Sequence, residues 1–284
     1  MAYAKNKGAD YIFKVFVYLL FTILTVLSIF PFLLMIINST RSTYQIQQHA
    51  ISFVPSTFLS NNWRIISKTK TFNPIRGFFN SLFISSSCTI LSVYFSTLTA
   101  YGLVVYQWKL RRSFFTFIMA IMMIPAQVTT IGFYQMVYKM GLVNNFLPLI
   151  IPAIAAPSMV FFMRQYMIPS LSLEIIESAR IDGAKEFFTF NAIALPIMKP
   201  AIATQAIFSF VNKWNELFLP LIILQDDKLK TMPIMVSLLK GDIYKVEYGS
   251  IYLGLTLTVL PLFVVYFALS RYIIAGVALG SVKG

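Results

Sequence analysis

Long apolar runs, separated by shorter polar connections, cover most of this chain. A helix needs about 20 predominantly apolar residues to cross a bilayer, and six runs reach that length. They occupy residues 12–37, 80–106, 113–138, 146–167, 202–224 and 250–274. The pattern predicts an all-α integral membrane protein with six transmembrane helices, in which residues 80–274 form the core.

The polar connections indicate an orientation. A very short loop between the second and third runs carries three cations, Lys109, Arg111 and Arg112, and basic residues at a membrane edge favour the cytoplasmic side. Six spans then place residues 1–11 and the tail 275–284 in the cytoplasm, and residues 38–79 and 225–249 outside. The segment 38–79 contains basic residues and no acid, so it is either a solvated loop, which we favour, or a docking surface for an extracytoplasmic partner.

Composition supports a membrane protein and argues against several other classes. Apolar residues make up 58% of the 284 residues, and the mean hydropathy of +0.75 is far above that of a soluble domain. The net charge is +13, but the bases are dispersed among loops, which does not indicate nucleic acid binding. Cys88 lies in an apolar run and His49 in a polar loop, so we expect neither a disulfide nor a metal site.

Catalytic motifs are missing from the sequence. It contains no Gly-x-x-x-x-Gly-Lys-Ser/Thr loop to hold ATP phosphates, no His-Glu-x-x-His pair and no Ser/His/Asp set. We therefore expect a non-catalytic subunit that binds no cofactor itself.

Residues 169–200 form the one long segment that is neither membrane-apolar nor turn-like. Ser170 or Ser172 can cap a helix here, and acids in its first turns suit the helix dipole. One helical stripe consists of Ile176, Ala179, Gly183 and Phe187. Small residues within the stripe would let the backbone lie close to another surface, and Pro196 and Pro200 are expected to break the helix.

Helical periodicity alone leaves two interpretations of this segment open. It is either an ordinary amphipathic helix in a loop or a helix that fits a groove on a partner protein. The order of its residues favours the second interpretation. Glu177-Ser178-Ala179, three residues, Gly183, nine residues and then Ile193-Ala194-Leu195-Pro196 resemble the EAA loop of permease subunits in bacterial ABC importers. Ser178 is the one departure from that pattern, and serine is also small.

A polar cluster interrupts the fifth apolar run. It consists of Asn212, Lys213, Trp214, Asn215 and Glu216, and ionisable residues at membrane depth usually face a cavity or a partner. Asn212, Asn215 and Glu216 would share one helix face. An aromatic ring beside amides and a carboxylate suits a sugar, so the cluster is either a substrate pathway or a polar clamp between helices.

Further stretches resemble the carbohydrate branch of these importers, and the match to a MalG-like (maltose-type) permease covers nearly the whole chain. They include Met122–Gln127, Phe162–Tyr166, Ala179–Ala184, Trp214–Leu217 and Gly280–Gly284. The resemblance implies a type I ABC importer permease fold in the bacterial inner membrane. It also implies four partners besides lipid: a MalF-like second permease, two ATP-binding subunits that hold ATP and Mg, and an extracytoplasmic sugar-binding protein.

The resemblance assigns roles to particular residues. Contact with an ATPase subunit through a coupling helix is implied for Glu177, Ser178, Ala179, Asp182, Gly183, Phe187, Leu195 and Pro196. A further contact with the ATPase dimer is implied for the tail residues Gly280, Ser281, Val282, Lys283 and Gly284. The outer loop 225–249 would reach toward the binding protein.

Three functions are compatible with these features. The first is a permease for a sugar or oligosaccharide that works by alternating access. The second is an ABC importer permease for another solute, because the EAA pattern is shared among importers. The third is a channel or receptor that needs no ATP. The run Trp214-Asn215-Glu216 and the Val282-Lys283-Gly284 end favour the first.

Overall fold

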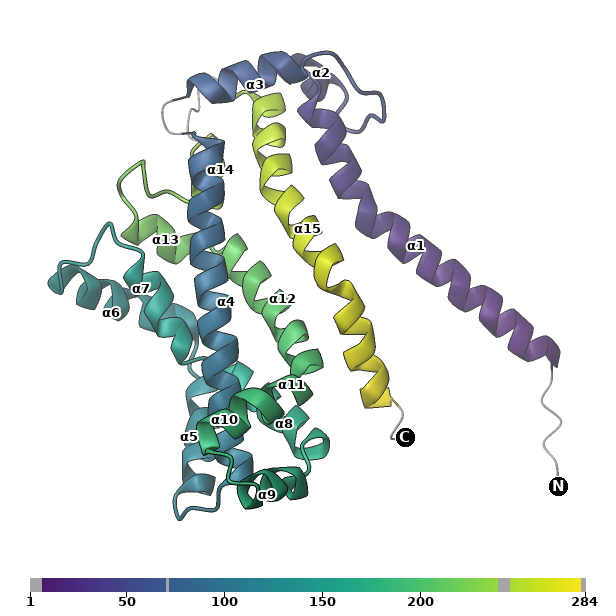
Figure 1. Cartoon of the computed structure of the whole chain (residues 1–284). Helices are drawn as coiled ribbons and strands as arrows, with labels where there is room; N and C mark the ends of the chain where they lie inside the picture. Colours follow the sequence, from purple (N-terminus) through teal and green to yellow (C-terminus); the bar gives the residue numbers. More distant parts are fainter. Residues whose placement is uncertain (1–6, 70–71, 240–245, 282–284) are drawn as a thin grey trace. The chain divides into compact units, whose positions relative to one another are not determined.

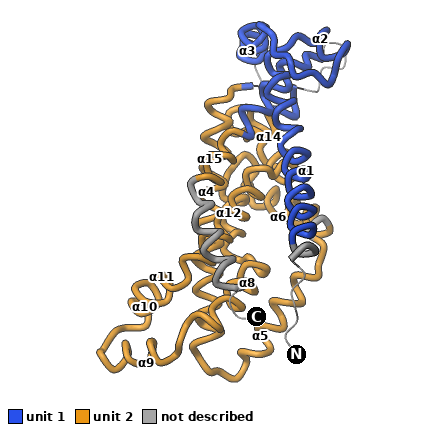
Figure 2. The backbone as a smooth tube through the Cα atoms, turned by 90° about the vertical axis from the view of Figure 1, so that its right-hand side faces the viewer, with its two compact units in different colours: residues 1–72, 236–259 blue, residues 73–235, 260–284 orange. Residues whose placement is uncertain are grey.

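The structure, a computed structural model, describes residues 7–69, 72–239 and 246–281. In these ranges the chain is helical and contains no strand, which confirms the expected all-α class (Figure 1). The chain divides into two compact units (Figure 2). The first comprises residues 1–72 and 236–259, and the second comprises residues 73–235 and 260–284.

The first unit contains α1 (Lys7–Ser39), α2 (Thr43–Gln48), α3 (Leu59–Lys68) and the start of α15 (Tyr248–Ser281). The apolar side chains of α1 are largely exposed within this chain, as expected of a helix that contacts lipid or another subunit. Arg41 follows α1 and is buried. Its guanidinium donates hydrogen bonds to the Asn38 side chain and to the carbonyl oxygens of Gln45 and His49.

The segment 38–79 is more helical than the solvated loop that we expected, although most of its described residues are exposed. It contains α2, α3 and the first turns of α4, together with the buried Arg41 network. The side chain of Ser42 caps α2 in a reciprocal capping box with Gln45. Local capping and a satisfied buried arginine therefore order a segment whose composition alone suggested solvent exposure.

Gly249 lies at a close approach of backbones in the first unit. A Cβ atom here would meet the carbonyl oxygen of Arg41 and the amide of Asn62, which is itself held by hydrogen bonds of 2.8 and 2.9 Å to the carbonyls of Ser39 and Arg41. We expect Gly249→Ala to lower the free energy of unfolding by about 1–3 kcal/mol, the usual cost of overpacking. Thermal denaturation of the purified protein measures the effect.

Gly102→Ala is the matched control, because nothing lies within 4 Å of a Cβ at Gly102. Alanine is also the better helix former, so this control should be neutral or slightly stabilising. Equal destabilisation by the two changes would contradict the close approach at Gly249.

The second unit is built around α4 (Pro74–Val105), which packs against α8 (Pro157–Ser170) and α12 (Lys199–Asn215; Figure 1). The side-chain oxygen of Asn73 accepts a hydrogen bond from the Arg76 amide at 3.0 Å and so caps the start of α4. Small hydroxyl residues let neighbouring membrane helices approach closely. Those of α4 that are buried include Ser81, Ser85, Ser96 and Thr97.

The third predicted span, 113–138, is not one helix. It is divided into α5 (Arg111–Met122) and α6 (Ala126–Lys139), and Pro125 lies at the division. Proline has no N–H to donate and disfavours helical conformation in the residue before it. Neither half alone has the length of a span.

The later spans also depart from uninterrupted helices. The fourth, 146–167, consists of α7 (Leu147–Ile150), the 3-10 turn η1 (Ile151–Ile154) and α8, each with a proline in its first turn. The fifth, 202–224, consists of α12 and α13 (Phe218–Ile223), and the outer loop 225–249 contains α14 (Met232–Leu238). In the described part of the chain, four helices are long and apolar enough to cross a membrane, or five if one bent pair is a single span. The six-span count therefore stays a prediction.

Candidate functional site

The segment predicted to couple to a partner begins with α9 (Leu173–Ile181). The Ser172 hydroxyl caps this helix by accepting a hydrogen bond from the Glu174 amide at 3.3 Å. The helix ends in a Schellman motif, in which the amides of Gly183 and Ala184 donate to the carbonyls of Arg180 and Ala179. Gly183 has φ +82°, in the left-handed region that glycine adopts without strain.

The position at which α9 ends corrects the predicted helical stripe of Ile176, Ala179, Gly183 and Phe187. Ile176 and Ala179 lie on the buried face of α9, but Gly183 is past the end of the helix and Phe187 belongs to α10 (Glu186–Thr189). The four residues therefore do not share one helix face. Nothing in this chain lies within 4 Å of a Cβ at Gly183, so the structure assigns this glycine a backbone role.

The segment continues as a bent helix toward the fifth span. After α10 come the π-helix η2 (Phe190–Ala194) and α11 (Leu195–Ile197), and this path meets α12 at an angle of 80°. Pro196 lies within this helical path, which runs on until the Met198 amide donates to the Ala194 carbonyl. The expected break before the fifth span is therefore found between Pro196 and Pro200. The direction changes at Met198, just before Pro200.

A buried core attaches the segment to the second unit. Ile176, Phe190 and Met198 are almost completely buried, and they pack with Tyr101 of α4 and Met163 of α8. Displacement of the segment must therefore act on α4, α8 and α12 together, because close-packed interiors transmit strain.

The opposite surface of the segment is exposed. Among the residues with predicted coupling roles, Ala179 is buried and Leu195 half-buried, while the exposed ones are Glu177, Ser178, Asp182, Gly183, Phe187 and Pro196. Large apolar side chains share this surface: Ile181 is 86%, Phe187 69% and Phe188 61% exposed. Exposed apolar patches of this kind mark sites of interaction with another protein or with a membrane.

A side-chain clasp joins α9, α10 and the end of α4. Arg180 Nε lies 2.7 Å from Glu186 Oε1, the Tyr106 hydroxyl donates to Glu186 Oε2, and the Arg180 guanidinium lies 5.5 Å from the Tyr106 ring centroid. The hydrogen bonds from Arg180 and Tyr106 lower the pKa of the Glu186 carboxyl below its usual value of 4.5. No local pattern in the sequence indicates this clasp, because its members are up to 80 residues apart.

The clasp predicts a small, pH-dependent contribution to stability. We expect Glu186→Gln to cost less than about 1 kcal/mol at neutral pH, because exposed ion pairs contribute little. A lowered pKa means that the carboxylate stabilises the fold above pH 4.5 and loses that effect as the pH falls through the lower folded-state value. The melting-temperature difference between wild type and variant should therefore be constant from pH 8 to about 5 and shrink below that. A melting-temperature difference that already shrinks between pH 7 and 6 would contradict a role for the Glu186 carboxylate in the clasp. Glu174→Gln on α9 is the matched control.

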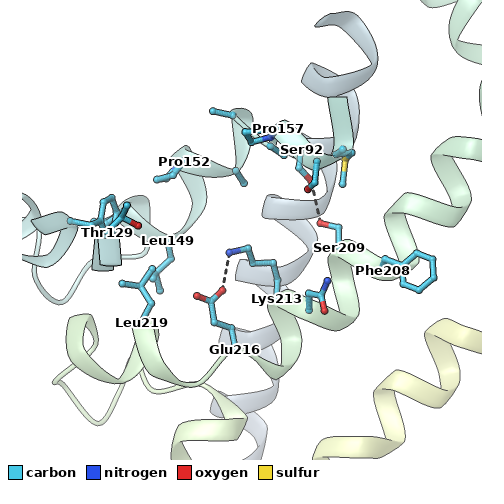
Figure 3. A pocket seen from close by; sticks show the side chains of 18 of the residues that line it. Ser92, Thr129, Leu149, Pro152, Pro157, Phe208, Ser209, Lys213, Glu216 and Leu219 are labelled. Carbon is cyan, nitrogen blue, oxygen red and sulfur yellow. Dashed lines mark hydrogen bonds and ion pairs between the residues drawn. The ribbon is translucent and has the colours of Figure 1, made fainter. Parts of the chain in front are cut away.

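A cavity of about 800 Å³ lies elsewhere in the second unit (Figure 3). Ser92 of α4, Thr129 of α6, the prolines at the starts of η1 and α8, and one face of α12 surround it. The α12 face contributes Gln205, Ser209 and Lys213 at a spacing of four residues. Their four-residue spacing in the sequence could have indicated this polar face of α12, but the face was not predicted.

Lys213 and Glu216 pair inside this cavity. Lys213 Nζ donates to Glu216 Oε2 at 2.8 Å, and both side chains are about one-third exposed (Figure 3). Ser92 and Ser209 meet across the cavity wall with their hydroxyls 3.2 Å apart. The two charges neutralise each other, and the rest of the lining combines neutral hydroxyl and amide groups with a larger number of apolar side chains.

The four residues predicted for a substrate pathway are separated by the structure. Asn212 and Glu216 line the cavity, whereas Asn215 ends α12 and is not part of the lining. Trp214 is 1% exposed, and its ring packs against Phe78 and Phe210. The interpretation that Trp214 stacks on a sugar is therefore corrected, since the ring is enclosed, stacked on Phe210 and in edge contact with Phe78.

The predicted C-terminal contact lies mostly beyond these observations. Gly280 and Ser281 end α15, and residues Val282, Lys283 and Gly284 lie outside the described residues.

Residues 92–278 match the family described as "Binding-protein-dependent transport system inner membrane component". The chain belongs to this family. It is therefore a permease subunit of a membrane transport system, as the resemblance of its EAA-like segment implied.

Curated relatives match over almost their full length. The arabinooligosaccharides transport system permease protein AraQ of Halalkalibacterium halodurans is 35% identical, over 93% of this chain and 94% of the relative. The lactose transport system permease protein LacG of Rhizobium radiobacter is 34% identical, over 90% of this chain and 92% of the relative. A chain in the crystal structure of a bacterial ABC transporter that imports the acidic polysaccharide alginate superposes with a TM-score of 0.79. At 21% identity, it covers 96% of this chain and 99% of its own, which supports the fold.

Proposed function

We propose that this chain is a permease subunit of an ATP-driven, binding-protein-dependent importer that moves a sugar or oligosaccharide across the bacterial plasma membrane by alternating access. The observation that carries the proposal is the exposed apolar surface of the segment 173–197, which is anchored to the core on its other side. Curated relatives named for arabinooligosaccharide and lactose transport support a sugar as the substrate.

The partners follow from the same surface. Ile181, Phe187 and Phe188 would occupy a groove on an ATP-binding subunit, as amphipathic helices do in other complexes. ATP and Mg would then be bound by two such subunits, with a second permease alongside and a sugar-binding protein outside. The termini and the coupling segment would be cytoplasmic.

The mechanism is a transfer of motion from the coupling segment to the cavity. When ATP closes the ATPase pair, the segment moves with its partner. Buried Ile176, Phe190 and Met198 pass the displacement to α4, α8 and α12. Because α12 also carries Ser209 and Lys213, the cavity walls shift with it.

The cavity suits a neutral, hydroxyl-rich solute. Its single ion pair is internally balanced, and hydroxyl and amide groups remain to exchange hydrogen bonds with a ligand. We propose Asn212, Ser209 and Glu216 as contacts along the substrate pathway. An importer permease for a non-sugar solute is the alternative, because the coupling surface does not depend on the substrate.

Transport assays in proteoliposomes test this function. The full complex, with its binding protein and ATP supplied on the appropriate sides, should take up labelled arabino- or galacto-oligosaccharides. Unlabelled oligosaccharides, but not amino acids, should compete. Uptake that persists without ATP would support a channel, and competition by amino acids alone would support the non-sugar alternative.

A further inference from the structure

A second, smaller pocket in the second unit is lined by arginines. It measures about 360 Å³ and lies between the first turns of α5 and the later part of α8. Arg111, Arg112 and Arg164 surround it together with Phe115 and Thr116. This pocket is separate from the large cavity, with which it shares no lining residue.

The pocket has an excess of positive charge. In the part of the chain that the structure describes, none of the three arginines forms an ion pair with an acid. The first turn of α5, where the helix dipole is positive, also contains no acid. Arg111 donates one hydrogen bond, of 3.3 Å, to the carbonyl of Tyr106. An anion here would meet several guanidinium donors and no carboxylate.

Arg164 is held in place with an unused donor. Its guanidinium lies 4.2 Å from the centroid of the Phe115 ring, and that ring in turn stacks on Phe161. The Nε atom of Arg164 is enclosed and has no hydrogen-bond partner. A buried donor without a partner costs free energy, which a bound acceptor would recover.

An apolar surface leads away from this basic pocket along α5. Phe115 of the pocket wall stacks on Phe161 of α8, and Met119 lies one turn further along the same face of α5. All three side chains are half-buried. A cationic pocket at a membrane edge, continued by half-buried apolar side chains on the same face, matches an amphiphile with an anionic head. A free anion would use only the pocket, and an acidic protein surface would leave the apolar face bare.

We propose that Arg111, Arg112 and Arg164 bind the phosphate of an anionic phospholipid whose acyl chains lie along α5. Phosphate oxygens accept hydrogen bonds from guanidinium forks in the geometry that arginine favours. Basic pockets between membrane helices are known to hold lipid head groups. The proposal rests on the membrane placement that the family provides, and it is independent of the transported substrate.

Lipid titration of the purified full complex in neutral detergent tests the site. Native mass spectrometry would give apparent affinities for phosphatidylglycerol and for phosphatidylcholine with the same acyl chains. We expect phosphatidylglycerol to bind about tenfold more tightly. Arg112→Gln and Arg164→Gln should each weaken it about tenfold, the loss of roughly one charge-assisted hydrogen bond. Arg164→Lys should fall between wild type and Arg164→Gln, because lysine keeps the charge and loses the fork.

Lys109→Gln is the matched control, because Lys109 is exposed on the same loop and does not line the pocket. Arg112 is exposed, so its variant keeps the test open if Arg164→Gln disturbs folding. Equal binding of the two lipids, or equal losses in Lys109→Gln and both glutamine variants, would overturn the proposal. Inorganic phosphate that competes at lipid concentrations would instead indicate a site for a free anion. Loss of a protein subunit with unchanged lipid retention would indicate an acidic protein partner.

Discussion

Gly183→Leu is expected to reduce ATP-dependent uptake to about a tenth or less, whereas Gly183→Asn should retain most of it. Gly183 closes the Schellman motif of α9 with φ +82°. A leucine in this conformation costs about 1–2 kcal/mol, whereas asparagine adopts it more readily. The strain would be relieved by a different chain direction after Ile181, and the segment 182–189 would then no longer fit its partner.

Uptake and binding-protein-stimulated ATP hydrolysis, measured in the same proteoliposomes, check this result. The leucine variant should still insert and still assemble its core, because no described residue other than its chain neighbours has an atom within 4 Å of the new Cβ. If both variants are equally inactive, a partner approaches position 183 too closely for any side chain. The glycine is then required for lack of space and not for its backbone conformation. If both are fully active, the coupling role of this turn is wrong.

Phe187→Ala is expected to weaken attachment of the ATPase subunits by about 30-fold. Phe187 is 69% exposed within this chain, yet it lies outside the spans beside Phe188 and Ile181. Buried aromatic anchors at protein interfaces typically cost 2 kcal/mol or more when truncated, and about 1.4 kcal/mol corresponds to tenfold in affinity. Co-purification of the ATPase at decreasing concentrations measures the change.

The control for Phe187 is another exposed phenylalanine. Phe83→Ala, on α4, removes a ring that is 56% exposed but belongs to a membrane-spanning helix. It should leave ATPase attachment unchanged. If both variants bind the ATPase like wild type, the exposed apolar surface of the coupling segment is not its docking surface, and the proposed coupling mechanism loses its main support.

In the segment 169–200, local sequence patterns predicted where the helix starts but not where it ends. The helix start at Ser172 and its acidic first turn were predictable, because a cap and a dipole act within a few residues. The end of the helix was misplaced, since the periodic stripe was continued through Gly183 into Phe187. A glycine seven residues after Ile176 can continue a stripe or end a helix. The Schellman hydrogen bonds decided which, and they depend on the backbone.

The membrane spans also show which features follow from local sequence and which depend on the surrounding structure. Hydropathy located the apolar runs, but the third run is divided at Pro125, and the path through Pro196 stays helical. Pro125 separates two helices, whereas Pro196 is accommodated inside a path that has a π-helical turn just before it, so the effect of a proline depends on the backbone around it. That backbone conformation is a property of the surrounding packing.

What the sequence by itself determined is the membrane location, the all-α class and the place of the polar segment 169–200, because each follows from hydropathy or from residue order within a short stretch. The tertiary structure alone decided which side chains of those stretches meet. It buried Trp214 between Phe78 and Phe210, paired Lys213 with Glu216 in the cavity, and joined Tyr106 to Glu186. Except for the Lys213–Glu216 pair, these contacts join residues far apart in the chain or depend on which helix face is buried, so no local pattern specifies them.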